Sequence, residues 1–373
     1  MPTITMDKQA LLSLIGVKLS DDELVELINS LKPEVEEITE NEITIEFTPD
    51  RPDMFSLEGL SRAIRLALGL ERPRKIRARN ARLSVKVEKV RARPFVACAI
   101  IRGAKLNEAT IKNLMNFQEA LHQTIGRNRR KVAIGLHDLD KIKPPIKYCE
   151  VSPETKLIPL GWESEATMKE ILQRHEKGVE FAHLLRDVKG YPAFIDELGV
   201  FSFPPIINSK RTMVTEKTRN FFLDMTATDE IALDQAMRVF VANLAWRGWK
   251  IEKVILIKDK ARYETPNLSE REIEINASYV NRLLGLNLKR DEIESLLKKA
   301  GYRVLGKKKA NLKLAVPPYR VDVLHPVDVV EDVAIIYGYS NFEPRLPNIT
   351  TIGKISDFSK FLDAIRELCI GAG

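Results

Sequence analysis

The chain has 373 residues, 44% hydrophobic and 30% charged, which is the balance of a folded protein with more than one core. Its net charge of +7 favours an acidic partner such as nucleic acid, although a thermophile-like surface rich in Lys and Glu explains the same excess. Three cysteines without a CxxC pair argue against disulfides and a thiolate zinc site, and no apolar run reaches the roughly 18 residues of a membrane span, so a cytoplasmic protein without a membrane partner is expected.

The N-terminal segment, residues 1–75, predicts a small α+β module. ITMDKQALLSLIGVKLSDDELVELI, which begins at Ile4, is typical of a short strand, a helix capped by Asp7 and ended by a glycine, and a second helix opened by the capping box Ser20-x-x-Glu23. The alternating run ITIEF predicts a further strand, and SLEGLSRAIRLALG a last helix. The unit is winged-helix-like, but its acidic second helix argues against binding in a nucleic-acid groove.

Residues 76–90 are expected to form a basic linker, and residues 91–265 a larger α+β domain. In chain order this domain should hold the strand RPFVACAIIRG, the helix NEATIKNLMNFQEALHQTIG, the strand KVAIGLHDLD, the helical stretch TMKEILQRHEKGVEFAHLL, the strand NFFLDMTATD and the long helix EIALDQAMRVFVANLAWRG. The Arg-rich stretch over residues 72–94 is either a solvated connector or a contact for phosphate groups.

The segment after the middle domain repeats the first module. IEINASYVNRLLGLNLKRDEIESLL begins at Ile273, 269 positions after Ile4, and the correspondence continues through the strand LKLAV to the helix PVDVVEDVAIIYGY. We therefore expect a second module over residues 266–347. A helix from Ser356 is expected to begin a further domain, over residues 348–373, that continues beyond this chain.

The predicted fold class is an α+β multidomain protein, in which two copies of a small strand–helix–helix–strand (winged-helix-like) module flank a larger α+β domain. The repeat also separates residues that the fold requires from residues added to it. An Arg and an Asp stand in both copies, so they fit a brace for the strand-to-helix turn: Arg51 with Arg320, and Asp53 with Asp322.

Three carboxylates on the last predicted helix of the second copy are not repeated in the first. Asp328, Glu331 and Asp332 share one helix face, where like charges repel, and the first copy has Glu, Ser and Arg at these places. With Asp322 close by, such a cluster can hold a hard cation, usually Mg²⁺, or meet a basic partner surface. A solvated acidic helix face explains the same pattern.

The strand NFFLDMTATD has one apolar and one polar face, because side chains alternate along a strand. A carboxylate and two hydroxyls in a row, with further polar residues upstream, predict a small polar pocket. The alternative is an edge strand with its polar face in water. The candidate residues are Asp224, Thr226, Thr228, Asn208, Ser209 and Glu216.

Two histidines in the middle domain suggest a general base, but the pattern around them is weak. A lone His at a helix end, such as His122, is more often a structural contact, and the HDLD run at His137 is a poor metal site. No Ser-His-Asp, HExxH or GxxxxGK[ST] pattern is present. Any hydrolysis is therefore expected to use a positioned water.

Longer motifs resemble a known family. The run P-x-R-x-D-x-x-H-P-x-D-x-x-E-D-V-A-x-x-Y-G-Y from Pro318, together with TPDRPDMFSLEGLSRAI, resembles the β subunit of phenylalanine–tRNA ligase. HQTIGRNRRKVAIGLHDLD and FPPIINSKRTMVTEKTRNFFLDMTATD are similar to its archaeal/eukaryotic form, and the similarity covers essentially the whole chain. The resemblance implies an N-terminal part of that subunit, in an α2β2 enzyme that attaches phenylalanine to tRNA-Phe with ATP and Mg²⁺, and places the synthetic site in the α subunit.

The resemblance also implies roles for particular residues. The middle domain becomes an editing domain that hydrolyses tyrosine wrongly attached to tRNA-Phe, where Asp224, Thr226 or Thr228 meets the amino acid. Asn208 and Ser209 would position water or the ester carbonyl, and Glu216 the substrate ammonium. The basic loop GRNRRK would hold the tRNA 3′ end through Arg127, Arg129 and Arg130. Four carboxylates would bind Mg²⁺ in a site shared with the α subunit: Asp322, Asp328, Glu331 and Asp332. The competing hypothesis is a non-catalytic tRNA-binding or protein-interaction scaffold.

Overall fold

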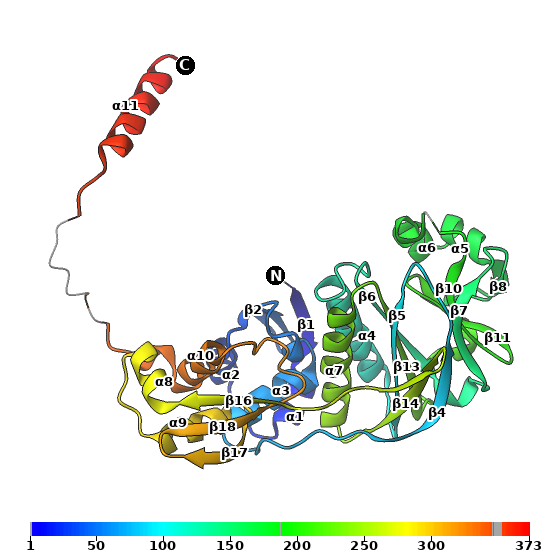
Figure 1. The fold of residues 1–373 in the computed structure, drawn as a ribbon, viewed down its shortest axis with the longest axis horizontal. Helices are drawn as coiled ribbons and strands as arrows, with labels where there is room; N and C mark the ends of the chain where they lie inside the picture. Colours follow the sequence, from blue (N-terminus) through cyan, green and yellow to red (C-terminus); the bar gives the residue numbers. More distant parts are fainter. Residues whose placement is uncertain (1, 187, 345, 347–352) are drawn as a thin grey trace. The chain divides into compact units, whose positions relative to one another are not determined.

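In a computed structural model, the structure describes residues 2–186, 188–344, 346 and 353–373. The chain divides into one compact unit that ends at Tyr337 and a second that begins at Gly338 (Figure 1). The second unit holds the short helix η5 (Tyr339–Asn341) and the helix α11 (Asp357–Gly371), which begins directly after Ser356. The predicted domain boundary between residues 347 and 348 lies outside the described residues.

The first module is a three-stranded antiparallel sheet, in the order β1-β3-β2, with helices packed on it. The predicted caps are present: the Asp7 carboxylate accepts a hydrogen bond from the backbone N–H of Ala10 at 2.6 Å, and Ser20 forms a capping box with Glu23. The elements in chain order are β1 (Thr3–Asp7), α1 (Lys8–Ile15), α2 (Asp21–Asn29), β2 (Glu34–Ile38), β3 (Glu42–Glu46), η1 (Pro52–Met54) and α3 (Leu57–Ala67).

The second module has the same strand order, β16-β18-β17, and the same sequence of elements, which agrees with the repeat. Each module has one strand that the sequence pattern did not predict. EVEEI and RVLGKK lack a clear alternation because neither strand has a fully buried side chain, whereas the other edge strands, β1 and β16, do. The elements are β16 (Arg271–Asn276), α8 (Ala277–Leu284), α9 (Arg290–Lys299), β17 (Arg303–Lys308), β18 (Asn311–Val316) and α10 (Pro326–Tyr337).

The middle domain is built on a mixed sheet that curls nearly into a barrel. Strand β4 runs parallel to both of its neighbours, and the other pairs are antiparallel. The two ends of the sheet approach each other, because the Asn208 side-chain amide on one end donates to the Leu136 carbonyl on the other at 3.2 Å. The strands in spatial order are β12 (Ile207–Asn208), β11 (Gly199–Phe203), β10 (Tyr191–Asp196), β7 (Ile146–Val151), β4 (Arg79–Val87), β14 (Lys250–Lys258), β5 (Phe95–Arg102), β13 (Asn220–Ala227) and β6 (Val132–Asp138), with β15 (Ala261–Thr265) beside β14.

Residues 76–90, predicted to be a basic linker, contain a strand of this sheet. β4 pairs with β14 and β7, and its apolar side chains Val85 and Val87 are buried in the barrel interior. Lys86, which lies between them, is exposed. The stretch reads as a linker because only half of the strand faces the core.

Helices cover the outside of the sheet (Figure 1). α4 (Glu108–Gln123) and α7 (Glu230–Trp246) pack on the face that holds Leu223, Met225 and Ala227, in an apolar cluster that continues into the first module. The predicted helical stretch near residue 175 is broken into α5 (Met168–Arg174) and α6 (Glu176–Phe181), because His175 leaves the helix and its ring caps α6.

In the part of the chain that the structure describes, no helix is long and apolar enough to cross a bilayer. Among the same residues, five smaller elements complete the middle domain. They are η2 (Leu139–Lys141), β8 (Lys156–Leu157), β9 (Ala166–Thr167), η3 (Ala182–Leu185) and η4 (Lys210–Thr212).

Candidate functional site

A cavity of about 350 Å³ opens at the point where the two ends of the large sheet meet. Its walls come from α4, β6, β11 and the loop that follows β11, and Asp224 on β13 lies at its wall. β13 is an interior strand, paired with β5 and β6, so the alternative of a solvent-facing edge strand is excluded. The polar residues that line the cavity are Gln118, Arg129, Lys177, Ser202, Asn208 and Asp224.

The Asp224 carboxylate is 1% exposed and is held by two side chains. One oxygen lies 2.8 Å from His137 Nε2, and the other accepts from the Ser202 hydroxyl at 3.2 Å. The other ring nitrogen of His137, Nδ1, lies 2.8 Å from the Thr212 hydroxyl, so the imidazole is held at both ends. Each carboxylate oxygen keeps a lone pair, so Asp224 retains acceptor capacity for a ligand.

Gly135, opposite Asp224 on β6, makes this arrangement possible. A Cβ atom at Gly135 would lie 2.1 Å from an Asp224 carboxylate oxygen. No L-residue with a side chain fits there unless the carboxylate moves.

The Gly135→Ala substitution should therefore lower the free energy of unfolding by about 1–3 kcal/mol, the usual cost of overpacking, and should displace Asp224. Urea unfolding measures this loss. Gly306→Ala, also in a strand but with no atom within 4 Å of the added Cβ, is the matched control and should change stability by less than about 0.5 kcal/mol. Equal effects of the two substitutions would contradict the assigned role of Gly135.

The two threonines predicted beside Asp224 do not line the cavity. Thr226 is fully buried, and its hydroxyl and carbonyl accept from the Arg93 guanidinium at 2.9 and 2.6 Å. Thr228 follows the end of β13, is exposed, and donates to the Arg130 carbonyl at 3.0 Å. The predicted ladder of three groups thus presents one of them, Asp224, to the cavity.

The three polar residues predicted upstream of β13 are also separated. Asn208 lines the cavity, whereas Ser209 is buried, accepts from the backbone N–H of Arg211 as the cap of η4, and donates to the Ile158 carbonyl at 3.2 Å. Glu216 is exposed and does not line the cavity. Sequence reasoning missed Ser202, although FSFPP places it at an inward position of β11.

The basic loop predicted to hold the tRNA 3′ end is turned partly inward. Arg127 and Arg129 have φ of +46° and +62° with another left-handed residue between them, which folds the loop back on the domain. Arg129 donates to the Ile206 carbonyl at 3.0 Å and lies over the Phe181 ring at 4.4 Å, so it builds the cavity wall. Arg127 and Arg130 are exposed.

His122 is buried and has a structural role. Its Nε2 accepts from the backbone N–H of Ile134 at 2.8 Å, which joins α4 to β6. Burial lowers the pKa of His122 to about 4, despite the favourable contact with Glu119. The ring is therefore neutral at neutral pH, as its acceptor role requires.

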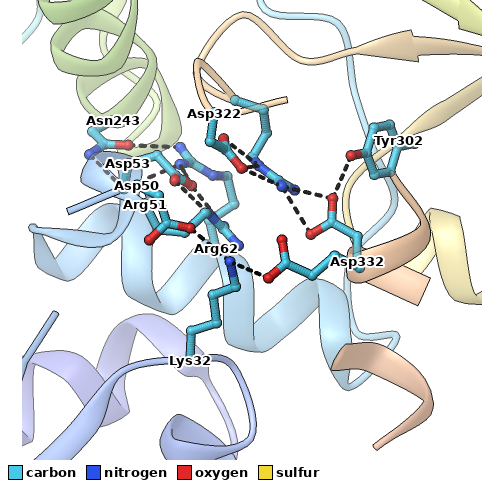
Figure 2. A network of polar contacts seen from close by, with 11 residues as sticks. Lys32, Asp50, Arg51, Asp53, Arg62, Asn243, Tyr302, Asp322 and Asp332 are labelled. Atoms are coloured by element: carbon cyan, nitrogen blue, oxygen red, sulfur yellow. Dashed lines mark hydrogen bonds and ion pairs between the residues drawn. The ribbon is translucent and has the colours of Figure 1, made fainter. Parts of the chain in front are cut away.

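A second polar network joins the two repeated modules (Figure 2). Lys32 of the first module forms ion pairs with Asp50 at 2.7 Å and with Glu331 of the second at 2.9 Å. Arg62 lies over the Tyr319 ring at 3.6 Å and donates to Asn243 of the middle domain at 2.8 Å. Polar contacts thus connect the two modules with each other and with the middle domain.

The repeated Arg–Asp pairs lie in this network, as a structural brace requires. Arg51 donates to Asp53 at 2.9 Å, and Arg320 donates to Asp322 at 2.7 Å. Burial acts to raise the pKa of Asp53, but the charges of Arg51 and Arg62 outweigh it and hold this pKa at about 2.

The four carboxylates predicted as Mg²⁺ ligands all have partners within the chain. Asp322 and Asp332 share Arg320, and Asp332 also accepts from the Tyr302 hydroxyl. Asp328 accepts hydrogen bonds from the backbone N–H groups of Leu324 and His325, each at 2.7 Å. Glu331 forms an ion pair with Lys32. Among the described residues, no group of three or more His, Cys, Asp and Glu side chains is arranged to hold a metal ion. This donor set does not fit Mg²⁺ as it stands.

Comparison with known proteins gives three matching family models. They are described as the Phe-tRNA synthetase beta subunit B1 domain over residues 1–69, the B3/4 domain over residues 79–244 and the tRNA synthetase B5 domain over residues 273–339. All of the chain matches 69% of the phenylalanine–tRNA ligase beta subunit of Methanocaldococcus jannaschii at 40% identity, and 69% of that of Pyrococcus furiosus at 40%. A crystal structure of an N-terminal fragment of the phenylalanyl-tRNA synthetase beta subunit from Pyrococcus horikoshii superposes with a TM-score of 0.87 at 38% identity, over 90% of this chain and 99% of that one.

Proposed function

The chain belongs to the family of phenylalanine–tRNA ligase beta subunits, and from this premise we propose that its middle domain hydrolyses tyrosine from mischarged tRNA-Phe in the cavity beside Asp224. A beta subunit of this family has an alpha subunit as its partner in a heterotetramer. We assign the synthesis of Phe-tRNA to that alpha subunit and place the enzyme in the cytoplasm.

The observation that carries the proposal is a buried carboxylate with acceptor capacity at the wall of the cavity. A synthetic site that binds phenylalanine rejects an isostere with one added hydroxyl only about 100-fold. A site that hydrogen-bonds this hydroxyl reverses the preference, because phenylalanine leaves the buried acceptor unpaired. Asp224 is such an acceptor, and His137 and Ser202 hold it in place.

Hydrolysis itself is assigned to a water molecule. The Ser202 hydroxyl is turned toward the Asp224 carboxylate, and we assign the Asn208 amide, which also lines the cavity, to orient water or the ester carbonyl. Arg127 and Arg130, exposed on the loop next to the cavity wall, are proposed to contact the tRNA 3′ end.

The test is the release of the amino acid from tyrosine-charged and phenylalanine-charged tRNA-Phe, measured with the α2β2 enzyme and with this chain alone. The α2β2 enzyme should release tyrosine about 100-fold faster or more, because only tyrosine can donate a further hydrogen bond to Asp224. Equal rates for the two esters in the α2β2 enzyme would contradict the proposal and support the scaffold hypothesis. Release by the α2β2 enzyme alone would mean that the tRNA needs the rest of the assembly to reach the cavity.

The Mg²⁺ site stays a prediction. Enzymes of this family use Mg²⁺, but here Arg320 neutralises Asp322 and Asp332 and Lys32 neutralises Glu331. A site shared with the alpha subunit would require these ion pairs to open. We derive no step of the proposed hydrolysis through a metal.

A further inference from the structure

A second groove, of about 420 Å³, lies between the extended segment before β4 and the junction of α7 with β14. Five cations line it, and no carboxylate does. It shares no lining residue with the cavity beside Asp224. The cations are Arg74, Lys75, Arg77, Arg79 and Lys250.

These cations have no carboxylate partners. All five are exposed, and within the described residues none of them forms an ion pair, whereas Arg51, Arg62 and Arg320 all have acidic partners. Like charges gathered without counter-charges repel one another and create a local positive potential. A bound polyanion removes that repulsion.

The segment is fixed in position even though its charges are free. Ile76 and Ala78 are half-buried and pack on the apolar cluster under the sheet, so the cations between and beside them project outward. The guanidinium carbon of Arg74 lies over the Trp246 ring, 4.4 Å from its centroid. Trp249, 8% exposed, packs on Phe221 and supports the floor of the groove. Stacking on an aromatic ring orients a guanidinium and leaves its N–H edge free for hydrogen bonds.

We propose that this groove binds the sugar–phosphate backbone of RNA. Three of the five cations are arginines, whose planar forks match phosphate oxygens, and their run along an extended segment suits a regularly spaced polyanion. That the RNA is a tRNA rests on the proposed function. The groove then positions the tRNA at a site separate from the cavity that cleaves its ester.

The test uses the 373-residue chain with Arg74→Gln, Arg77→Gln and Arg79→Gln together, and uncharged tRNA-Phe as the probe. Fluorescence anisotropy over a range of salt concentrations should show affinity reduced about tenfold or more at low salt. The slope of log K against log salt should fall by about 2 to 3, because each lost phosphate contact removes about 0.7 to 0.9. These side chains are exposed, so thermal unfolding should be unchanged.

The matched control removes the same charge elsewhere. Lys289→Gln, Lys308→Gln and Lys309→Gln replace three exposed lysines in the second module that form no ion pair with described residues. This variant should keep the salt slope of the unchanged chain. An equal loss in both variants, or no loss in the arginine variant, would overturn the proposal. A groove variant that loses binding to polyglutamate but keeps binding to tRNA would also overturn it, and would indicate an acidic protein partner.

The same variants separate this proposal from the editing proposal. In the α2β2 enzyme with saturating tRNA, the groove variant should release tyrosine at the normal rate, because the groove and the cavity share no residue. If variants of the cavity release tyrosine at the normal rate, editing in the cavity is refuted, but the result on RNA binding by the groove still stands. A groove variant whose tyrosine release at saturation falls as far as its affinity would overturn the separation of the two sites.

Discussion

Replacing Asp224 by alanine should slow the release of tyrosine from tRNA-Phe by about 100- to 1,000-fold, the loss expected when a buried group that positions the substrate is removed. The carboxylate is the acidic residue that lines the cavity, and its two donors would be left to bind each other or water. Charging with phenylalanine should not change, since that step is assigned to the alpha subunit. Single-turnover deacylation by the α2β2 enzyme measures the first effect.

Two further variants distinguish a loss of activity from a loss of stability. Asp224→Ala also leaves His137 and Ser202 unpaired, so it should destabilise the domain by about 1–3 kcal/mol. Asp224→Asn preserves the shape and shows whether the loss of activity follows the charge. Asp196→Asn, at a buried aspartate paired with Arg211 away from the cavity, should reduce stability but keep tyrosine release. Normal release by both Asp224 variants would place the editing site elsewhere.

Replacing Arg320 by methionine should lower the free energy of unfolding by about 3–5 kcal/mol. Methionine retains much of the side chain's length but leaves Asp322 and Asp332, two nearly buried carboxylates, without their cation. The cost of an unpaired buried charge exceeds the value of the lost bonds. Urea unfolding of the chain gives the change directly.

The control is Arg290→Met in the same module. Arg290 pairs with Asp291, which is well exposed, so its loss should change stability by about 0–1 kcal/mol. Adding Asp322→Asn and Asp332→Asn to Arg320→Met should recover part of the loss, because neutral amides need no cation. A chain that tolerates Arg320→Met as well as Arg290→Met would mean that the network is solvated.

Local patterns in the sequence predict much of the fold. The repeat is confirmed by the matching strand orders of the two modules. Leu223 and Met225, which the alternation in NFFLDMTATD places on one apolar face, lie together in the apolar cluster under the helices. Asn208 and Asp224, two of the six predicted pocket residues, line the cavity. These patterns succeed because burial on one face leaves a period of two or 3.6 in the sequence.

The rest depends on contacts between distant residues, which no local pattern records. Arg93 donates a hydrogen bond to Thr226, which follows it by 133 positions. Arg129 donates to the carbonyls of Pro205 and Ile206, which follow it by 76 and 77 positions. Sequence reasoning could not see that Lys32 neutralises Glu331, so the acidic helix face looked unpaired. The strands β2 and β17 were missed for the different reason that neither has a fully buried side chain to leave an apolar alternation.

The joining of the two modules has a consequence for the order of events during synthesis. Glu331 follows Lys32 by 299 positions. A ribosome that adds about 5–20 residues per second therefore makes Lys32 about 15–60 s before Glu331 of the second module. During that interval Lys32 lacks Glu331 and Arg62 lacks the ring of Tyr319, on a surface that the finished protein buries. The middle domain, which supplies Asn243, is complete before the second module and can shield Arg62 first. The nascent chain is therefore expected to be most open to aggregation or chaperone capture before the second module emerges.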